Sequence, residues 1–250
     1  MSRTRSFPLF AAIFIVLSMQ ACILGPLSGG AAPAPGSGSG GGSAGACSNP
    51  WEPVATGATW SYTVSGPTSG SYVRTIQSVS ADGFSMQDVF SNGTSDVGKW
   101  KCDQGALTAV DPLSADVSGA NGTFSMQTTS TDGEGMPAGI KPGDSFSITY
   151  HMAGTMTEHG KTGKVKEDLS ESCKADGMQS VTVAAGSFNA LHLTCQLGLM
   201  MQMTIAGSTF PQNSTSVAER WYAAGIGLVK STDQSNAGLR EVDLSSYKIR

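Results

Sequence analysis

The chain has 250 residues, of which 39% are hydrophobic, and its 15 basic and 19 acidic residues give a formal net charge of −4. An acidic chain without a basic stripe argues against a nucleic-acid partner and against attachment to anionic lipid by charge alone.

The first 21 residues predict a secretory signal. Arg3 and Arg5 form a basic start, and residues 7–17 form an uncharged run that is shorter than the roughly 20 residues needed to span a bilayer. The run leads into LSMQAC, which resembles the lipobox of bacterial lipoproteins and ends at Cys22. Cleavage by an ordinary signal peptidase would put the bulky Met19 at position −3, where a small residue is preferred. We therefore expect lipidation of Cys22 and an exported protein anchored at the extracytoplasmic face of a membrane.

Residues 22–46 predict a lipidated cysteine followed by a flexible linker. The segment is rich in Gly, Ser, Ala and Pro, a composition that cannot bury a core and that spans about 27 Å as a random coil. It contains a GxSxG match at residues 41–45. That motif needs a strained turn from a strand into a helix, which a glycine tract does not provide, so we assign no nucleophile there.

The five cysteines indicate disulfides in an exported domain. If Cys22 carries the lipid, four remain, and three connectivities are open to them. We favour Cys47–Cys102 and Cys173–Cys195, because the second pair lies close in sequence across a predicted strand–turn–strand unit. A zinc site is the rival interpretation, but the cysteines lack CxxC spacing.

Residues 47–250 predict a single all-β domain. Apolar and polar residues alternate over 146–156 and 191–205, and more briefly near Trp60 and Phe84, as expected of strands with one buried face. We expect an antiparallel β-sandwich or a curved half-barrel with long strands and little helix. The segment 191–205 either bends at Gly198 or forms one long curved strand. Similarity between residues 57–62 and 143–148 also suggests two related halves.

The domain resembles a family of uncharacterised exported bacterial lipoproteins with a C-terminal WYAxGxGxVK-type β-domain. The resemblance spans most of residues 47–250 and is carried by residues 49–54 with 57–62, 99–102, 180–190 and 221–230. It implies an envelope lipoprotein, and it implies no activity and no catalytic residues.

No motif in the chain identifies a catalytic, metal or cofactor site. His151 and His192 fall on the polar faces of predicted strands and His159 falls in a loop, so we interpret all three as surface histidines. The acidic turn at 132–134 offers too few oxygens for calcium, and the glycines at 225–227 lack a nucleotide-binding context. Trp60, Trp100 and Trp221 are expected as core anchors.

Methionine is the most distinctive feature of the predicted inward faces. Methionine fills irregular apolar space, so these residues could line a face for an apolar ligand such as a lipid, although a loosely specified core explains them more simply. The five residues are Met86, Met152, Met156, Met201 and Met203.

The leading hypothesis is therefore a non-enzymatic module, tethered to the membrane by its lipid, that binds an apolar ligand, an envelope component or a protein partner. Two alternatives remain open: a structural spacer of the envelope, and an enzyme whose site is assembled from dispersed residues.

Overall fold

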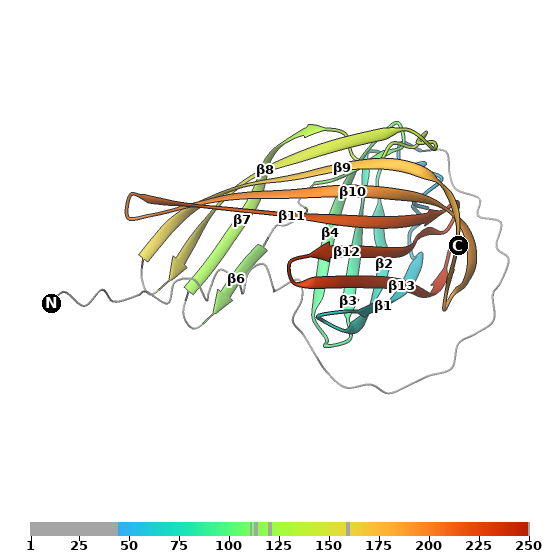
Figure 1. The fold of residues 1–250 in the computed structure, drawn as a ribbon, viewed down its shortest axis with the longest axis horizontal. Helices are drawn as coiled ribbons and strands as arrows, with labels where there is room; N and C mark the ends of the chain where they lie inside the picture. The colour runs from blue at the N-terminus through green and yellow to red at the C-terminus, as the bar shows by residue number, and fades with distance from the viewer. Residues whose placement is uncertain (1–44, 111, 113–114, 120–121, 159–160, 250) are drawn as a thin grey trace.

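The computed structural model describes residues 45–249 except 111, 113–114, 120–121 and 159–160 (Figure 1). The predicted signal, Cys22, nearly all of the linker and His159 lie outside the described residues. The described chain is built from β-strands and turns, and none of it is a helix long and apolar enough to cross a bilayer.

Among the described residues, thirteen strands form one antiparallel sheet, which confirms the predicted fold class. Along the sheet the order is β5-β4-β3-β2-β1-β13-β12-β11-β10-β9-β8-β7-β6. The strands are β1 (Thr59–Ser65), β2 (Gly70–Val79), β3 (Gly83–Phe90), β4 (Ser95–Asp103), β5 (Ala106–Ala109), β6 (Ala115–Gly119), β7 (Gly122–Gly133), β8 (Ser145–Glu158), β9 (Lys161–Val183), β10 (Gly186–Ile205), β11 (Ser208–Ala223), β12 (Gly227–Ser235) and β13 (Gly238–Lys248).

Pairing between the first and last strands joins two meanders into this one sheet. Each strand pairs with the next strand in sequence, except β5 and β6, which lie at opposite edges of the sheet. In addition, β1 pairs with β13. The β1–β13 register runs from Thr59 opposite Lys248 to Ser65 opposite Glu241.

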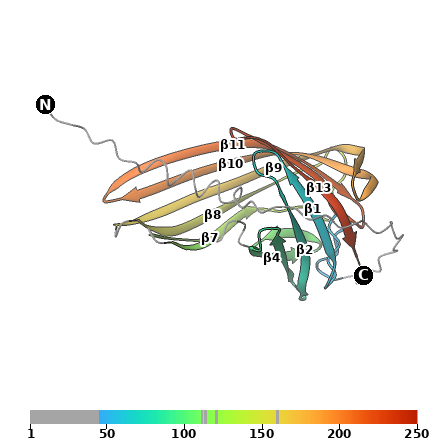
Figure 2. The same cartoon turned by 90° about the horizontal axis from the view of Figure 1, so that it is seen from below.

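The sheet coils into a curved half-barrel. Strands β7–β11 extend to one side, and β1–β4 turn across the other end, so the sheet has a concave inner face (Figures 1 and 2). The edge strand β5 is not left open along its whole length, because Leu107 exchanges two backbone hydrogen bonds with Met136, at 3.0 and 3.1 Å. This bridge brings the β5 edge against the connection between β7 and β8.

Two unusually long strands build the extended side. β9 has 23 residues and β10 has 20, and they pair along almost their whole length. Of the two possibilities for residues 191–205, the long continuous strand is the one observed. The register shift lies at His192/Leu193 rather than at Gly198.

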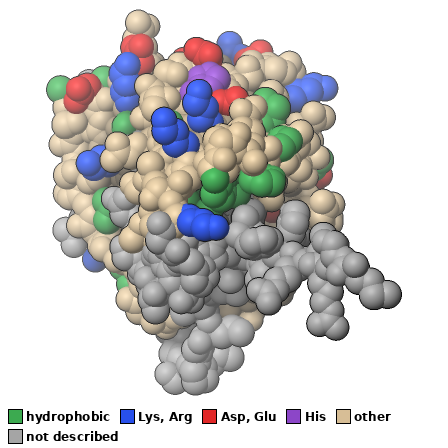
Figure 3. All heavy atoms as spheres, turned by 90° about the vertical axis from the view of Figure 1, so that its left-hand side faces the viewer, with side chains coloured by type: hydrophobic (Ala, Val, Ile, Leu, Met, Phe, Trp, Pro, Cys, Tyr) green, Lys and Arg blue, Asp and Glu red, His purple; other side chains and the backbone are tan. Residues whose placement is uncertain are grey.

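The inner face carries the core, as the period-two pattern predicts. Trp60 is 1% exposed and donates a hydrogen bond from Nε1 to the Ile226 carbonyl oxygen at 2.6 Å. Trp100 packs half-buried against the same cluster of core residues. Trp221 is also buried, but it points to the outer face, where it lies directly opposite His192 on β10. Basic, acidic and apolar side chains are interspersed on the described part of the end formed by the tips of β8–β11 (Figure 3).

Both favoured disulfides are present. Cys47 is bonded to Cys102 on β4, and Cys173 on β9 is bonded to Cys195, the residue directly opposite on β10.

Candidate functional site

An irregular segment at the start of the domain closes one side of the coiled sheet. We call residues 45–58 the plug. Pro50 and Pro53 make the segment a poor strand, and the Asn49 side chain accepts a hydrogen bond from the Trp51 backbone N–H at 2.9 Å, which fixes a local turn. The plug therefore crosses the inner side of the sheet and joins it at its last two residues, where Gly57 and Ala58 share backbone hydrogen bonds with Ile76 on β2.

The plug is fastened to two turns of the sheet, one near the β5 edge and one in the middle of the strand order. The buried Asn49 amide donates to the Gly105 carbonyl oxygen at 2.9 Å, and the Gly225 N–H donates to the Pro50 carbonyl oxygen at 2.7 Å. Gly105 is required at its position, because its φ is +87° and an added Cβ would lie 2.4 Å from the Ser48 carbonyl oxygen. With the Cys47–Cys102 disulfide, these contacts fix the plug between β4–β5 and the β11–β12 turn.

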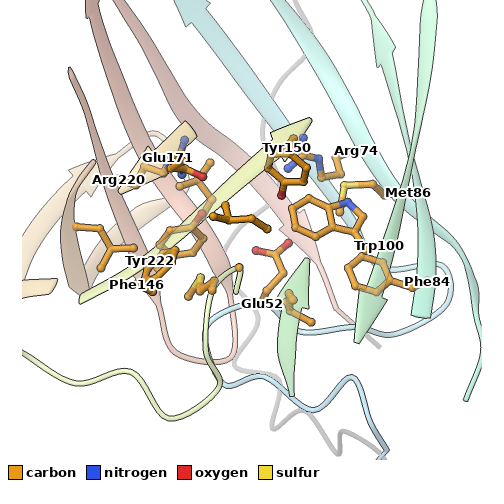
Figure 4. Close-up of a pocket in the computed structure, with 16 residues that line it drawn as sticks. Glu52, Arg74, Phe84, Met86, Trp100, Phe146, Tyr150, Glu171, Arg220 and Tyr222 are labelled. Atoms are coloured by element: carbon orange, nitrogen blue, oxygen red, sulfur yellow. The ribbon is translucent and has the colours of Figure 1, made fainter. Parts of the chain in front are cut away.

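A cavity of about 100 Å³ lies between the plug and the inner face. Its walls come from strands far apart in the sequence, so it forms only when the sheet coils (Figure 4). β3 and β4 contribute one apolar side, and β8, β10 and β11 contribute the other. Large apolar and aromatic side chains line it, including Phe84, Met86, Trp100, Phe146, Ile148 and Tyr222.

Two arginines face the cavity, and each is neutralised by an acid. Arg74 makes a two-point contact with Asp88, the residue opposite it on β3, with Nε–Oδ1 and Nη2–Oδ2 distances of 2.9 and 2.7 Å. Arg220 forms an ion pair with Glu171 on the other wall. Paired in this way, the two guanidinium groups contribute little net charge to the cavity.

Glu52 differs from these acids, because no hydrogen bond or ion pair reaches its carboxylate from the described residues. The half-buried plug residue points its carboxylate among the labelled side chains in Figure 4. Burial raises the pKa of Glu52 to about 7, because leaving water disfavours the charged form, and nearby Arg74 offsets only part of this rise. Near neutral pH this carboxyl can therefore either donate or accept a hydrogen bond.

Gly227 lies beside this carboxyl. Its φ of +101° favours glycine, and an added Cβ would be in ordinary contact with Glu52 Oε2, at 3.4 Å, and with Trp60 Nε1, at 3.6 Å. The glycines at 225–227 form the β11–β12 turn, and the Gly225 N–H bond to Pro50 joins this turn to the plug.

Two tyrosines supply further hydroxyl groups around the cavity. Burial raises the pKa of Tyr150 and of Tyr222 to about 12, so both phenols stay protonated at physiological pH. The cavity therefore combines apolar walls with a few hydroxyl and carboxyl groups, which is the composition of a small-ligand site.

The predicted methionine face is divided by the structure. Met86 lines the cavity, whereas Met152, Met156, Met201 and Met203 belong to a separate cluster farther along β8 and β10. The sequence pattern places all five on inner faces, but it cannot show that the coiled sheet separates them.

His151 lies on the outer face, as predicted. Its Nδ1 is 2.6 Å from Asp168 Oδ1 and its Nε2 is 3.0 Å from Asp132 Oδ2. Hydrogen bonds to Asp132 and Asp168 raise the His151 pKa above its usual value. With both ring nitrogens engaged by carboxylates, His151 is not presented as a base to a nucleophile.

The prediction that His192 is a surface residue is wrong. His192 does lie on the outer face, but it is only 8% exposed, because it stacks on Trp221 with ring centroids 4.7 Å apart. The Gln179 side chain is hydrogen-bonded to both rings. Its Nε2 lies 3.0 Å from His192 Nδ1, and its Oε1 accepts a hydrogen bond from Trp221 Nε1 at 3.0 Å. Period-two alternation assigns a face, but it does not show which polar-face residues an aromatic neighbour covers.

One group of potential metal ligands occurs among the described His, Cys, Asp and Glu side chains: Glu171, Cys173 and Cys195. Both sulfur atoms of this group are bonded to each other, so neither is a thiolate that could bind a metal.

Sequence reasoning missed the charged residues of the cavity. Arg74, Glu171 and Arg220 each occupy an inward position of an alternating strand, as shown by buried neighbours two residues away such as Ile76, Cys173 and Ala218. A charged residue at an inward position of an alternating strand is therefore the signal in the sequence that could have found these three residues. Glu52 has no such signal, because the plug has no periodicity.

No protein-family model matches the chain, and neither does any curated protein. Three solved structures share some shape with it. The first, from Bacteroides fragilis, is provisionally described as an exported protein with a YmcC-like fold; it is 16% identical, with 80% of this chain and all of that chain covered and a TM-score of 0.47. A provisionally described lipoprotein from Parabacteroides distasonis is 14% identical, with 80% and 99% covered and a TM-score of 0.46.

The hypothetical lipoprotein YmcC from Escherichia coli is 9% identical, with 76% of this chain and 84% of that chain covered and a TM-score of 0.32. At these identities and TM-scores we draw no functional conclusion from the three likenesses.

Proposed function

We propose that the chain is an exported envelope lipoprotein, anchored through Cys22, whose β-domain binds an apolar ligand without catalysing a reaction. The observation that carries the binding proposal is the cavity: apolar walls from both sides of the coiled sheet surround one carboxyl, Glu52, that has no partner among the described residues. A buried polar group without a partner is costly, and a ligand that supplies one would remove that cost.

The size of the cavity limits what enters it. Sites for drug-sized ligands measure about 300–1,000 Å³, and an engineered cavity of about 150 Å³ holds benzene. The 100 Å³ found here therefore fits one end of a longer apolar molecule, such as the tip of a lipid chain that carries a hydrogen-bonding group opposite Glu52.

The sequence supports the location. The basic start, the short apolar run, the lipobox-like residues before Cys22 and the glycine-rich linker together favour a tethered exported domain. The outer-face charge pattern adds no argument for a nucleic-acid partner.

A cavity-filling substitution tests the proposal. In Leu228→Phe the larger ring occupies part of the cavity that Leu228 lines. We expect the unaltered protein, purified gently from its own envelope, to show an additional mass in native mass spectrometry that extracts into organic solvent. The variant should lose that mass.

Leu239→Phe is the matched control, since the same change is made at a residue that is 49% exposed on β13. The control should keep the additional mass. An unaltered protein that carries no extractable mass, or a mass retained equally by both variants, would contradict the proposal.

A further inference from the structure

A second group of inner-face residues lies away from the plug. Four methionines, Met126, Met152, Met201 and Met203, are between 2% and 7% exposed and pack in one cluster with Phe124 and Val165. They come from β7, β8 and β10, so the cluster depends on the register of four adjacent strands.

Strand pairing places an acid in the middle of these thioethers. Glu167 on β9 is directly opposite Met152 on β8 and directly opposite Met201 on β10. Residues directly opposite one another in neighbouring antiparallel strands have Cβ atoms about 4.5–5.5 Å apart on the same face. Glu167 is therefore flanked on both sides by a methionine.

Glu167 is unusual for a buried acid. It is 3% exposed, and no hydrogen bond or ion pair joins its carboxylate to any described residue. Burial raises the pKa of Glu167 to about 7, so its charge is disfavoured where it lies. Its strand neighbours on this face are Val165 and Leu169, which offer no compensating charge. Lys166 and Asp168 alternate with it onto the outer face.

The chemistry of these donors restricts which cation could compensate the acid. Calcium requires six to eight oxygen ligands and magnesium six, and this cluster contains a single carboxylate. Zinc prefers thiolate and imidazole, and the cluster contains neither. Thioethers are soft, uncharged ligands that select Cu(I) over harder ions. A monovalent ion beside one carboxylate would also leave the buried site with no net charge.

We propose that Met152, Glu167 and Met201, with Met203 and Met126 beside them, form a binding site for a soft monovalent metal ion of the Cu(I) and Ag(I) class. The two flanking thioethers are the principal ligands, and the carboxylate balances the charge. The site is independent of the cavity near Glu52, so either proposal can fail without the other.

Competition for Cu(I) tests this site. The full chain with Cys22→Ser is used, because its remaining cysteines are in disulfides and no free thiol is present to bind copper. Cu(I) is kept reduced with ascorbate in the absence of oxygen and is offered together with the coloured chelator bicinchoninate. We expect the protein to withdraw one equivalent of Cu(I). Failure to withdraw copper overturns the proposal.

Two variants locate the ion. Met152→Leu with Met201→Leu removes both flanking thioethers at nearly constant apolar volume and should weaken binding about 10- to 100-fold. Met178→Leu with Met200→Leu makes the same change at methionines that are 43% and 56% exposed and should leave binding unchanged. Equal affinity in the two double variants would place the copper elsewhere and reject the site.

A third variant and a spectrum cover the case in which the double variant does not fold. Glu167→Gln removes the buried charge without changing the shape and should also weaken Cu(I) binding about tenfold or more. X-ray absorption of the copper-loaded protein should show scattering from thioether sulfur. Unchanged affinity of Glu167→Gln, or scattering from oxygen and nitrogen alone, contradicts the assignment.

Discussion

Single residues set the electrostatic character of the inner face. Glu52 lies in the cavity without a partner among the described residues, whereas Arg74 and Arg220 are each paired with an acid. The raised pKa of Glu52 links its environment to the stability of the fold.

Between about pH 4.5 and pH 7 the unfolded chain loses the Glu52 proton while the folded chain retains it, so this residue makes stability fall as pH rises. The Glu52→Gln variant should show a smaller fall across that window, by about 2 kcal/mol after allowance for the partial exposure of the residue. Urea unfolding at pH 4.5 and pH 7.5 measures the difference.

Other groups also make stability fall as pH rises. Their contribution is the same in the Glu52→Gln variant and in the unaltered protein, so it cancels when the two are compared. The raised pKa of Glu167 acts in the same window and that of His151 acts above about pH 6.5. Glu134→Gln, at an exposed position, is the control. Identical pH profiles for Glu52→Gln and the unaltered protein would show that the Glu52 carboxyl is not in a desolvating cavity.

At the scale of elements, the plug determines whether the cavity is closed. Its disulfide joins Cys47 to Cys102 across 55 residues of sequence, whereas Cys173–Cys195 spans 22 residues of two strands that are already paired. The first bond should stabilise the fold more, because it closes the longer loop and because no other covalent bond among the described residues holds the plug to the sheet.

Replacing Cys47 and Cys102 by Ser should lower the free energy of unfolding by about 2–4 kcal/mol and expose residues 45–58 to proteases. Replacing Cys173 and Cys195 by Ser should cost less and leave the plug protected. Urea unfolding and limited proteolysis provide the two readouts. A larger loss from the second pair, or a protease-resistant plug in the first variant, would contradict this role of the plug.

The sequence predicts some elements well and others poorly, for physical reasons. β10 and β8 are visible as alternating apolar residues because their inner faces contain Leu, Met and Tyr. β9 is less visible, since Glu167 and Glu171 occupy inward positions where an apolar residue is expected. β11 contains Pro211 and many hydroxyl residues, so its pattern is weak.

The candidate site was much less predictable than the strands. The cysteine count and spacing led to both disulfides, and the methionine alternation led to inner-face residues. The β1–β13 pairing, the bridge between Leu107 and Met136 and the course of the plug depend on contacts between distant segments. Local periodicity carries no information about such contacts, so Glu52 could not be placed near Arg74 or Tyr150 from the sequence.

At the scale of the whole molecule, the proposal places a ligand-binding domain on a flexible tether. The linker enters the domain at the plug, so the tether and the covering element of the cavity are continuous in sequence. The predicted anchor is Cys22, and a change there should alter the location of the protein without altering the domain.

Cys22→Ser should move the protein from the membrane fraction into the soluble fraction, because the lipid is the proposed attachment. Fractionation followed by immunoblotting measures this. Ala44→Ser, near the other end of the linker, is a control that should remain with the membrane. A Cys22→Ser protein that still sediments with membranes would contradict anchoring through this cysteine.

The most direct test of the binding proposal is a crystal structure of the oxidised protein purified from its own envelope, examined for electron density in the cavity. The proposal predicts elongated density whose end lies among Glu52, Trp100 and Tyr150, with a polar atom within hydrogen-bonding distance of the Glu52 carboxyl. A cavity that contains only ordered water, or that is closed by its own side chains, would contradict the claim that this protein binds an apolar ligand there.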